Sequence, residues 1–206
     1  MLLDRETKQV EFVRANDAKS TPVYVYEGAV IDANRYRGWN RENIRNDQNY
    51  GIESNPKVWV MREFQNTKEN HLGIALPKGR VRFYTRDDAG RLQFVGENNI
   101  DHTPTDEVVR VYTGNAFDLV GERKRTSYQN DIQNRSASES FEIKLRNRKT
   151  TATEIRVIER LYHGDNWNLT AQSDRSNKMD SNTIEFRIPV QPNEERVVTY
   201  TVHYTW

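Results

Sequence analysis

The clearest pattern of hydrophobic and polar positions lies at the end of the chain, in residues 183–206. Hydrophobic residues occupy every second position in two runs, residues 184–190 and 198–206, and a polar link with proline and asparagine separates them. Strict alternation is typical of strands with one buried face, so the two runs predict a terminal β-hairpin. Its second strand carries an aromatic row that we expect in the core: Tyr200, Tyr204 and Trp206.

Shorter runs of the same kind recur along the rest of the chain, roughly 8–12 residues apart, and they show no helical periodicity. The pattern predicts an all-β protein of antiparallel β-sandwich units, the C-terminal one immunoglobulin-like. We expect the runs at 141–146 and 153–162 to pair as a hairpin, and no helix anywhere. The other predicted strands lie at residues 8–14, 23–27, 58–64, 80–86, 92–96, 108–113, 117–122 and 167–171.

Two polar stretches interrupt this pattern. Residues 32–56 are rich in asparagine and arginine, which predicts a long loop or an elaborated hairpin. A loop of this length in a compact domain is either functional or mobile. Residues 124–138 are the best candidate for a domain boundary, although a strand at 126–128 fits there too. The predicted organisation is therefore an N-terminal β-rich unit at 1–122 with an insertion at 32–56, and a sandwich at 123–206.

Composition excludes several classes of function but does not indicate a particular one. The 31 Lys and Arg residues balance the 30 Asp and Glu residues, and the net charge of +1 gives no global field for nucleic acid or an anionic membrane. The chain has no cysteine, which excludes disulfides, thiolate nucleophiles and cysteine-ligated zinc. Its first residues are charged and resemble neither a signal peptide nor a membrane anchor. We expect a soluble chain that does not insert into membranes and does not bind nucleic acid.

Several motifs resemble the mucoidy-inhibitor-like family of bacterial proteins, whose C-terminal domain is of unknown function. The motifs are HLGIALPKGRVRFY at 71–84, LQFVGE at 92–97, IDHTP at 100–104, NAFDLVGERK at 115–124, ESFEI at 139–143, TYTVHYTW at 199–206 and ETKQV at 6–10, which looks like the family's first strand of this region. The resemblance covers nearly the whole chain and implies the C-terminal part of a secreted or envelope protein. It supplies no catalytic residues, because its shared motifs are turn and strand signatures.

Candidate catalytic and metal-binding residues are few. Asp101, His102 and Thr103 with Ser127 or Ser138 suggest a triad, but triads depend on geometry and no nucleophile elbow is present. The histidines are dispersed, and neither the acidic run at 174–180 nor Asp87 with Asp88 matches a calcium loop. We predict a non-enzymatic protein without cofactor or metal.

The aromatic and basic residues of the long loop are the best candidates for a binding site: Tyr36, Trp39, Arg41, Arg45 and Tyr50. Tyrosine, tryptophan and arginine are enriched in protein interfaces, while aromatic faces beside amide groups suit sugars. The aromatic residues can also fold back as cover for the sandwich. We predict an extracellular, periplasmic or envelope structural module that contacts a protein or a second copy of itself. The alternative is a carbohydrate-binding module that uses residues 36–50, and a hydrolase is the third possibility.

Overall fold

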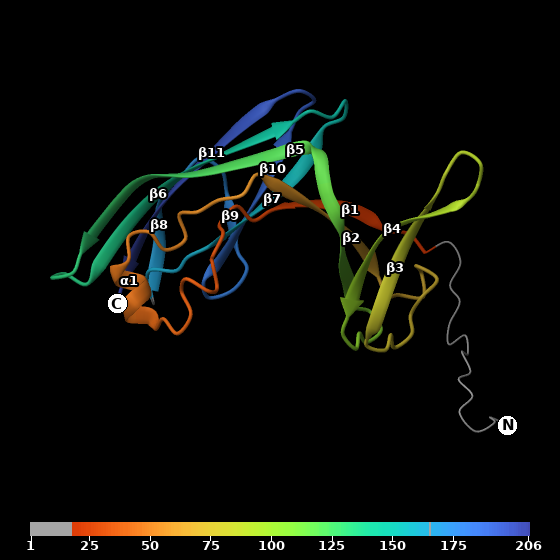
Figure 1. Ribbon diagram of the computed structural model, residues 1–206, viewed down its shortest axis with the longest axis horizontal. Coiled ribbons are helices and arrows are strands. Elements are labelled where there is room, and N and C mark those ends of the chain that lie inside the picture. The colour runs from red at the N-terminus through yellow and green to blue at the C-terminus, as the bar shows by residue number, and fades with distance from the viewer. Residues whose placement is uncertain (1–17, 165) are drawn as a thin grey trace, which may run out of the picture. The chain divides into compact units, whose positions relative to one another are not determined.

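The computed structural model describes residues 18–164 and 166–206 (Figure 1). Strands account for 58% and helix for 3%, which confirms the predicted all-β class. The strand predicted at 8–14 lies outside the described residues. The elements are β1 Thr21–Tyr26, α1 Arg41–Asn46, β2 Lys57–Gln65, β3 Gly79–Arg86, β4 Leu92–Ile100, β5 Val108–Asp131, β6 Ser136–Asn147, β7 Thr153–Arg160, β8 Asn166–Gln172, β9 Ser176–Lys178, β10 Thr183–Val190 and β11 Glu195–Thr205.

The described chain divides into two compact units. Unit 1 contains residues 18–22 with Arg62–Val111, and unit 2 contains Val23–Met61 with Tyr112–Trp206. This division differs from the expected one at 122/123, which falls inside β5. The polar residues there, which suggested a linker, continue β5 and pair with β6, and Arg123 among them is buried.

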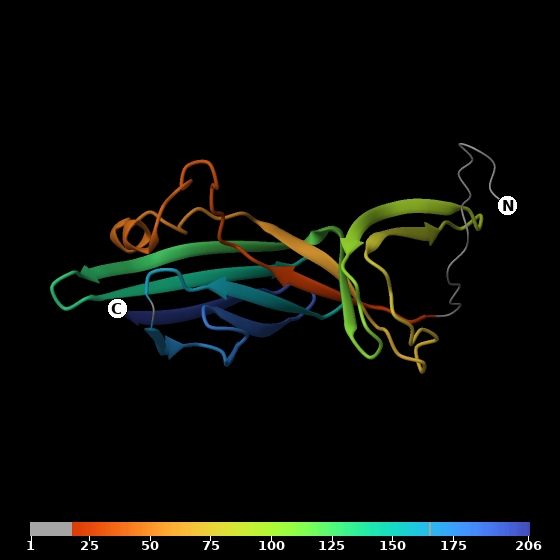
Figure 2. The same cartoon turned by 90° about the horizontal axis from the view of Figure 1, so that it is seen from below.

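Most of the strands form one sheet in the order β8-β11-β6-β5-β2-β1-β7-β10-β9. Among the pairings with a described register, β1 with β7 is parallel and the others are antiparallel. Phe186 of β10 and Tyr200 of β11 lie far apart in that order, yet their ring centroids are 5.7 Å apart. The sheet of unit 2 therefore folds over and buries its own inner face, which is compatible with a β-sandwich; Figure 2 shows its layered strands edge-on.

The predicted terminal hairpin is wrong in its pairing. β10 pairs with β7 and β9, whereas β11 pairs with β6 and β8. The alternation was nevertheless correct, because Tyr200 and Tyr204 are buried as expected and so are the hydrophobic residues of β10. The two strands present their apolar faces to each other across the core, and an alternating pattern specifies the buried face without specifying the partner strand.

Two further strand predictions need correction. β6 and β7 do not form a hairpin, since β6 lies between β11 and β5 while β7 lies between β1 and β10. The runs predicted at 108–113 and 117–122 belong to one continuous strand, β5, which runs on to Asp131.

The expectation of no helix is also wrong, since α1 spans Arg41–Asn46 inside the long loop. Asn40 caps it: its side chain accepts from the Asn43 amide, and the Asn43 side chain accepts from the Asn40 amide. This reciprocal capping box satisfies two amides that a helix start leaves open. Six residues give too little apolar periodicity to predict a helix, so the asparagines were its only signal.

Unit 1 contains a two-stranded antiparallel ribbon, β3 with β4. Buried Asn66 organises the loops beside it, since its amide donates to the carbonyls of Ile74 and Pro104 at 2.6 and 2.7 Å. The ribbon exposes several large hydrophobic side chains: Tyr84, Leu92, Phe94 and Val95.

Candidate binding surface around helix α1

The loop at 32–56, with its flanking residues, is closed at its base by hydrogen bonds within unit 2. The Val30 amide donates to the Glu53 carbonyl at 2.8 Å, and the Asn55 amide donates to the Gly28 carbonyl at 3.0 Å. The Asn55 side chain adds a bond to the Glu27 carbonyl at 3.1 Å. The loop therefore leaves and returns at one place, in the manner of a compact Ω-loop.

A buried ion pair holds the C-terminal part of this loop against the sandwich. Nε of Arg123 lies 3.0 and 2.9 Å from the two carboxylate oxygens of Glu159, and both side chains are almost fully buried. Arg123 also donates through Nη1 to the Gly51 carbonyl at 2.7 Å, and Tyr200 donates to Glu159 at 2.5 Å. Burial alone would lower the pKa of Arg123, but Glu159 and Tyr200 raise it above its usual value. Arg123 is therefore held as a cation that fixes the loop backbone.

A second buried cluster holds the end of α1. Glu139 accepts from Arg125 at 3.0 Å and lies 3.0 Å from Nδ1 of His163. Nε2 of His163 lies 3.4 Å from the Asp47 carbonyl, and Asp47 is the residue that follows α1. Burial acts to raise the pKa of Glu139, but His163 and Arg125 bring it below its usual value. The two ring nitrogens of His163 thus link the Glu139 carboxylate to the backbone at the end of α1.

The structure brings together three of the predicted binding residues. The Tyr36 ring packs edge-on against Trp39 at 4.8 Å and against Tyr50 at 4.7 Å, and Tyr50 continues the cluster to Tyr162 at 5.3 Å. Tyr36 is 8% exposed and Trp39 36% exposed, so Tyr36 serves as packing while Trp39 reaches the surface. Burial raises the pKa of Tyr162 to about 12.

The two predicted arginines lie on α1, four residues apart. Arg41 is its exposed first residue, and Arg45 has its guanidinium 5.5 Å from the centre of the Trp206 ring. The aromatic cluster and the arginines thus belong to one surface, which we call the α1 platform: residues 32–56 with the β5–β6 tip and the end of β11. Figure 2 shows the loop and α1, in orange, beside β5.

Two open grooves flank α1. The first, of about 560 Å³, lies between α1 and β5 and is lined by Trp39, Asn43, Asn46, Asp47, Gln48, Asn49, Tyr128 and Asn130. The second, of about 600 Å³, is lined by Glu42, Arg45, Asn46, Ile132, Gln133, Arg135 and Trp206. The sequence showed the loop asparagines as a group, but it gave no sign that the end of β5 would complete the first groove.

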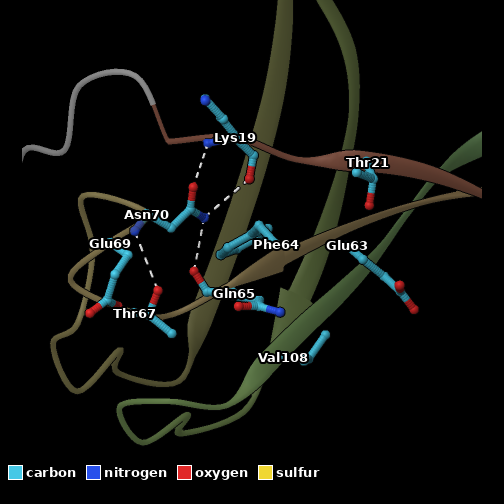
Figure 3. Close-up of a pocket in the computed structure, with 9 residues that line it drawn as sticks. All are labelled: Lys19, Thr21, Glu63, Phe64, Gln65, Thr67, Glu69, Asn70 and Val108. Carbon is cyan, nitrogen blue, oxygen red and sulfur yellow. Dashed lines mark hydrogen bonds between the residues drawn. The ribbon is translucent and has the colours of Figure 1, made fainter.

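Unit 1 has a smaller pocket, of about 360 Å³ (Figure 3). It is lined by Lys19 and Thr21, by the end of β2 with the loop that follows it, and by the first residue of β5. Asn70 closes one side of it, since it accepts from the Lys19 amide at 2.8 Å and donates to the Lys19 and Gln65 carbonyls. Glu63 at the other side is paired with Arg110. These polar groups hold the chain together, and they do not converge on a common point.

The candidate catalytic residues belong to two different units. His102 accepts at Nδ1 from the Lys78 amide at 3.2 Å in unit 1, and Asp101 pairs with Lys78. Ser138 is in unit 2 and contacts His203 at 2.9 Å. Within the described ranges no three His, Asp or Glu side chains are grouped as metal ligands, and no helix there is long and apolar enough to cross a membrane.

A search of protein-family models found no match to the chain, and no curated protein or solved structure matches it significantly. The resemblance to the mucoidy-inhibitor-like family therefore stays an expectation.

Proposed function

We propose that the protein is a non-enzymatic binding module of the bacterial envelope or extracellular space. In this proposal unit 2 is an immunoglobulin-like sandwich that presents the α1 platform to a partner. The supporting observation is that two buried side chains contact the platform backbone: Arg123 donates to the Gly51 carbonyl, and His163 lies 3.4 Å from the Asp47 carbonyl. Fixing a loop before binding reduces the entropy that binding must remove.

Co-sedimentation with isolated bacterial envelope fractions tests this function. We expect the wild-type chain to sediment with the envelope and Trp39→Ala to sediment less, because Trp39 is the exposed ring of the platform. Phe117→Ala is the control, since Phe117 is a fully exposed aromatic residue outside the platform, at 98% exposure. Equal sedimentation of the two variants, or none by the wild type, would reject the proposal.

Self-association through the β3–β4 ribbon is the second candidate. Within the described chain β3 and β4 pair only with each other, so each leaves one edge open for another strand. The face that carries Tyr84 and Phe94 also carries both charge signs, with Arg80 and Arg82 each 3.2 Å from Glu97. In this candidate, Glu97 of one copy pairs with an arginine of the other copy across a two-fold axis, beside the contact between the aromatic rings.

Sedimentation velocity over a range of protein concentrations tests this second candidate. We expect the wild type to form dimers or larger species, and Phe94→Glu to remain monomeric because it places a charge in the apolar contact. Phe117→Glu is the matched control and should associate like the wild type. A monomeric wild type, or association that Phe94→Glu leaves unchanged, would contradict it.

A further inference from the structure

The first groove beside α1 has a lining that suits one class of ligand. It combines two aromatic rings, Trp39 and Tyr128, with five carboxamide side chains and one carboxylate. Carboxamides donate and accept, as sugar hydroxyls do, and aromatic faces pack against the apolar faces of sugar rings. We propose that this groove binds a neutral oligosaccharide. The inference rests on the proposed function and names the ligand class of the platform.

Free polar groups in the groove are available to such a ligand. Asn46 and Gln48 are exposed, and neither side chain makes a hydrogen bond within the described part of the chain. Asp47 uses one carboxylate oxygen to accept from the Asn49 amide at 2.6 Å, which holds the turn after α1. The turn therefore presents consecutive polar side chains along one wall.

The opposite wall contains polar atoms that lack partners. The hydroxyl of Tyr128 and the side-chain oxygen of Asn130 are buried and unpaired among the described residues. Burial, followed by Glu139, raises the pKa of Tyr128, while Arg125 and Asn130 act in the opposite direction. Asn130 is thus near the hydroxyl, but the two groups do not reach hydrogen-bond geometry. Unpaired buried polar atoms are uncommon, and a hydroxyl-rich ligand that shifts these side chains slightly would satisfy them.

The charge of the groove selects among ligands. No lysine or arginine contributes to the lining that the described residues form, so it offers no cation to phosphate, nucleic acid or acidic sugars. The lining also differs from a protein-binding hot spot, where tryptophan, tyrosine and arginine gather in a desolvated pocket, because most of its side chains are carboxamides and none is an arginine. Asp47 is its single carboxylate, whereas most glycoside hydrolases use two flanking the scissile bond. The geometry therefore favours binding of a neutral sugar over cleavage.

Isothermal titration of the full chain with cello-, chito- and malto-oligosaccharides tests the inference. At least one of these neutral oligomers should bind, and the double variant Asn46→Ala with Gln48→Ala should bind it about tenfold more weakly, as expected for two lost hydrogen bonds. Both residues are exposed, so this variant should fold normally. Asn34→Ala is the matched control, because Asn34 is an exposed asparagine of the same loop outside the groove.

Several outcomes would overturn the inference. They are no binding by any of the three oligomers, equal affinity in the double variant, tighter binding of oligogalacturonate, or a loss that appears with Trp206→Ala in the second groove instead. If the oligomers fail while envelope sedimentation still depends on Trp39, only the ligand class is wrong. If both fail, the proposed function fails too.

Discussion

The buried arginine of unit 2 offers the most quantitative test of how the platform is held. Arg123→Met removes a cation whose side chain is 2% exposed and leaves Glu159, whose side chain is 0% exposed, without its partner. Breaking a buried pair by removing one partner costs about 3–5 kcal/mol, because a charge remains in a medium that solvates it poorly. The loss of the bond to the Gly51 carbonyl adds about 1 kcal/mol.

Arg146→Met is the matched control. Arg146 pairs with Glu122 at 2.7 Å, but the side chains are 30% and 52% exposed, and such pairs contribute about 0–1 kcal/mol. Urea unfolding followed by circular dichroism should show a large fall in midpoint for Arg123→Met and a small one for Arg146→Met. Adding Glu159→Gln to Arg123→Met should restore part of the loss, because the unpaired charge is then removed.

Hydrogen exchange measures the local effect of the same substitution on the loop backbone. Amides near Gly51 should exchange faster in Arg123→Met, since the carbonyl that anchors the loop is released. Equal unfolding midpoints for Arg123→Met and Arg146→Met, with unchanged exchange near Gly51, would refute the account of the anchor.

Three further predictions concern the same unit. The pKa of Glu139 is lowered in the folded state, so its contribution to stability is present above the unfolded value of about 4.3 and is lost as the pH falls through the folded value. Acid unfolding should therefore be steeper in the wild type than in Glu139→Gln, and parallel curves would contradict this. Gly121→Ala should destabilise by about 1–3 kcal/mol in urea, because a Cβ there overlaps the Tyr26 ring; an unchanged midpoint would show that the ring moves aside. Asn147→Ala should cost about 1–3 kcal/mol by the same assay, since its buried amide donates to the Thr151 and Val190 carbonyls at 2.9 and 3.0 Å, and a neutral result would mean that water replaces it.

The sequence predicted the strands well because an alternating pattern reports which face of a strand is buried. It did not predict their partners, since β10 and β11 alternate just as a hairpin would and yet pair with different neighbours. Partner choice depends on contacts between distant residues, such as Phe186 with Tyr200, which no local pattern encodes. The all-β class was therefore predictable, whereas the sheet order was not.

The polar stretch after residue 122 suggested a linker although it continues β5, and the difference has a physical reason. Charged residues usually indicate solvent, but Arg123 is buried because Glu159, 36 positions away, neutralises it. The groove lining was likewise predictable only in part. The aromatic residues and asparagines of the loop stood out in the sequence as a group. Tyr128 and Asn130 did not, because they reach the groove through a strand that looked like a linker.

The most direct measurement is hydrogen exchange of the full chain with and without solubilised envelope polysaccharide. The account predicts added protection in α1 and in the β5 residues 128–130, with the β3–β4 ribbon unchanged. Protection confined to the ribbon, or no protection anywhere at saturating polysaccharide, would contradict the claim that the α1 platform is the binding surface.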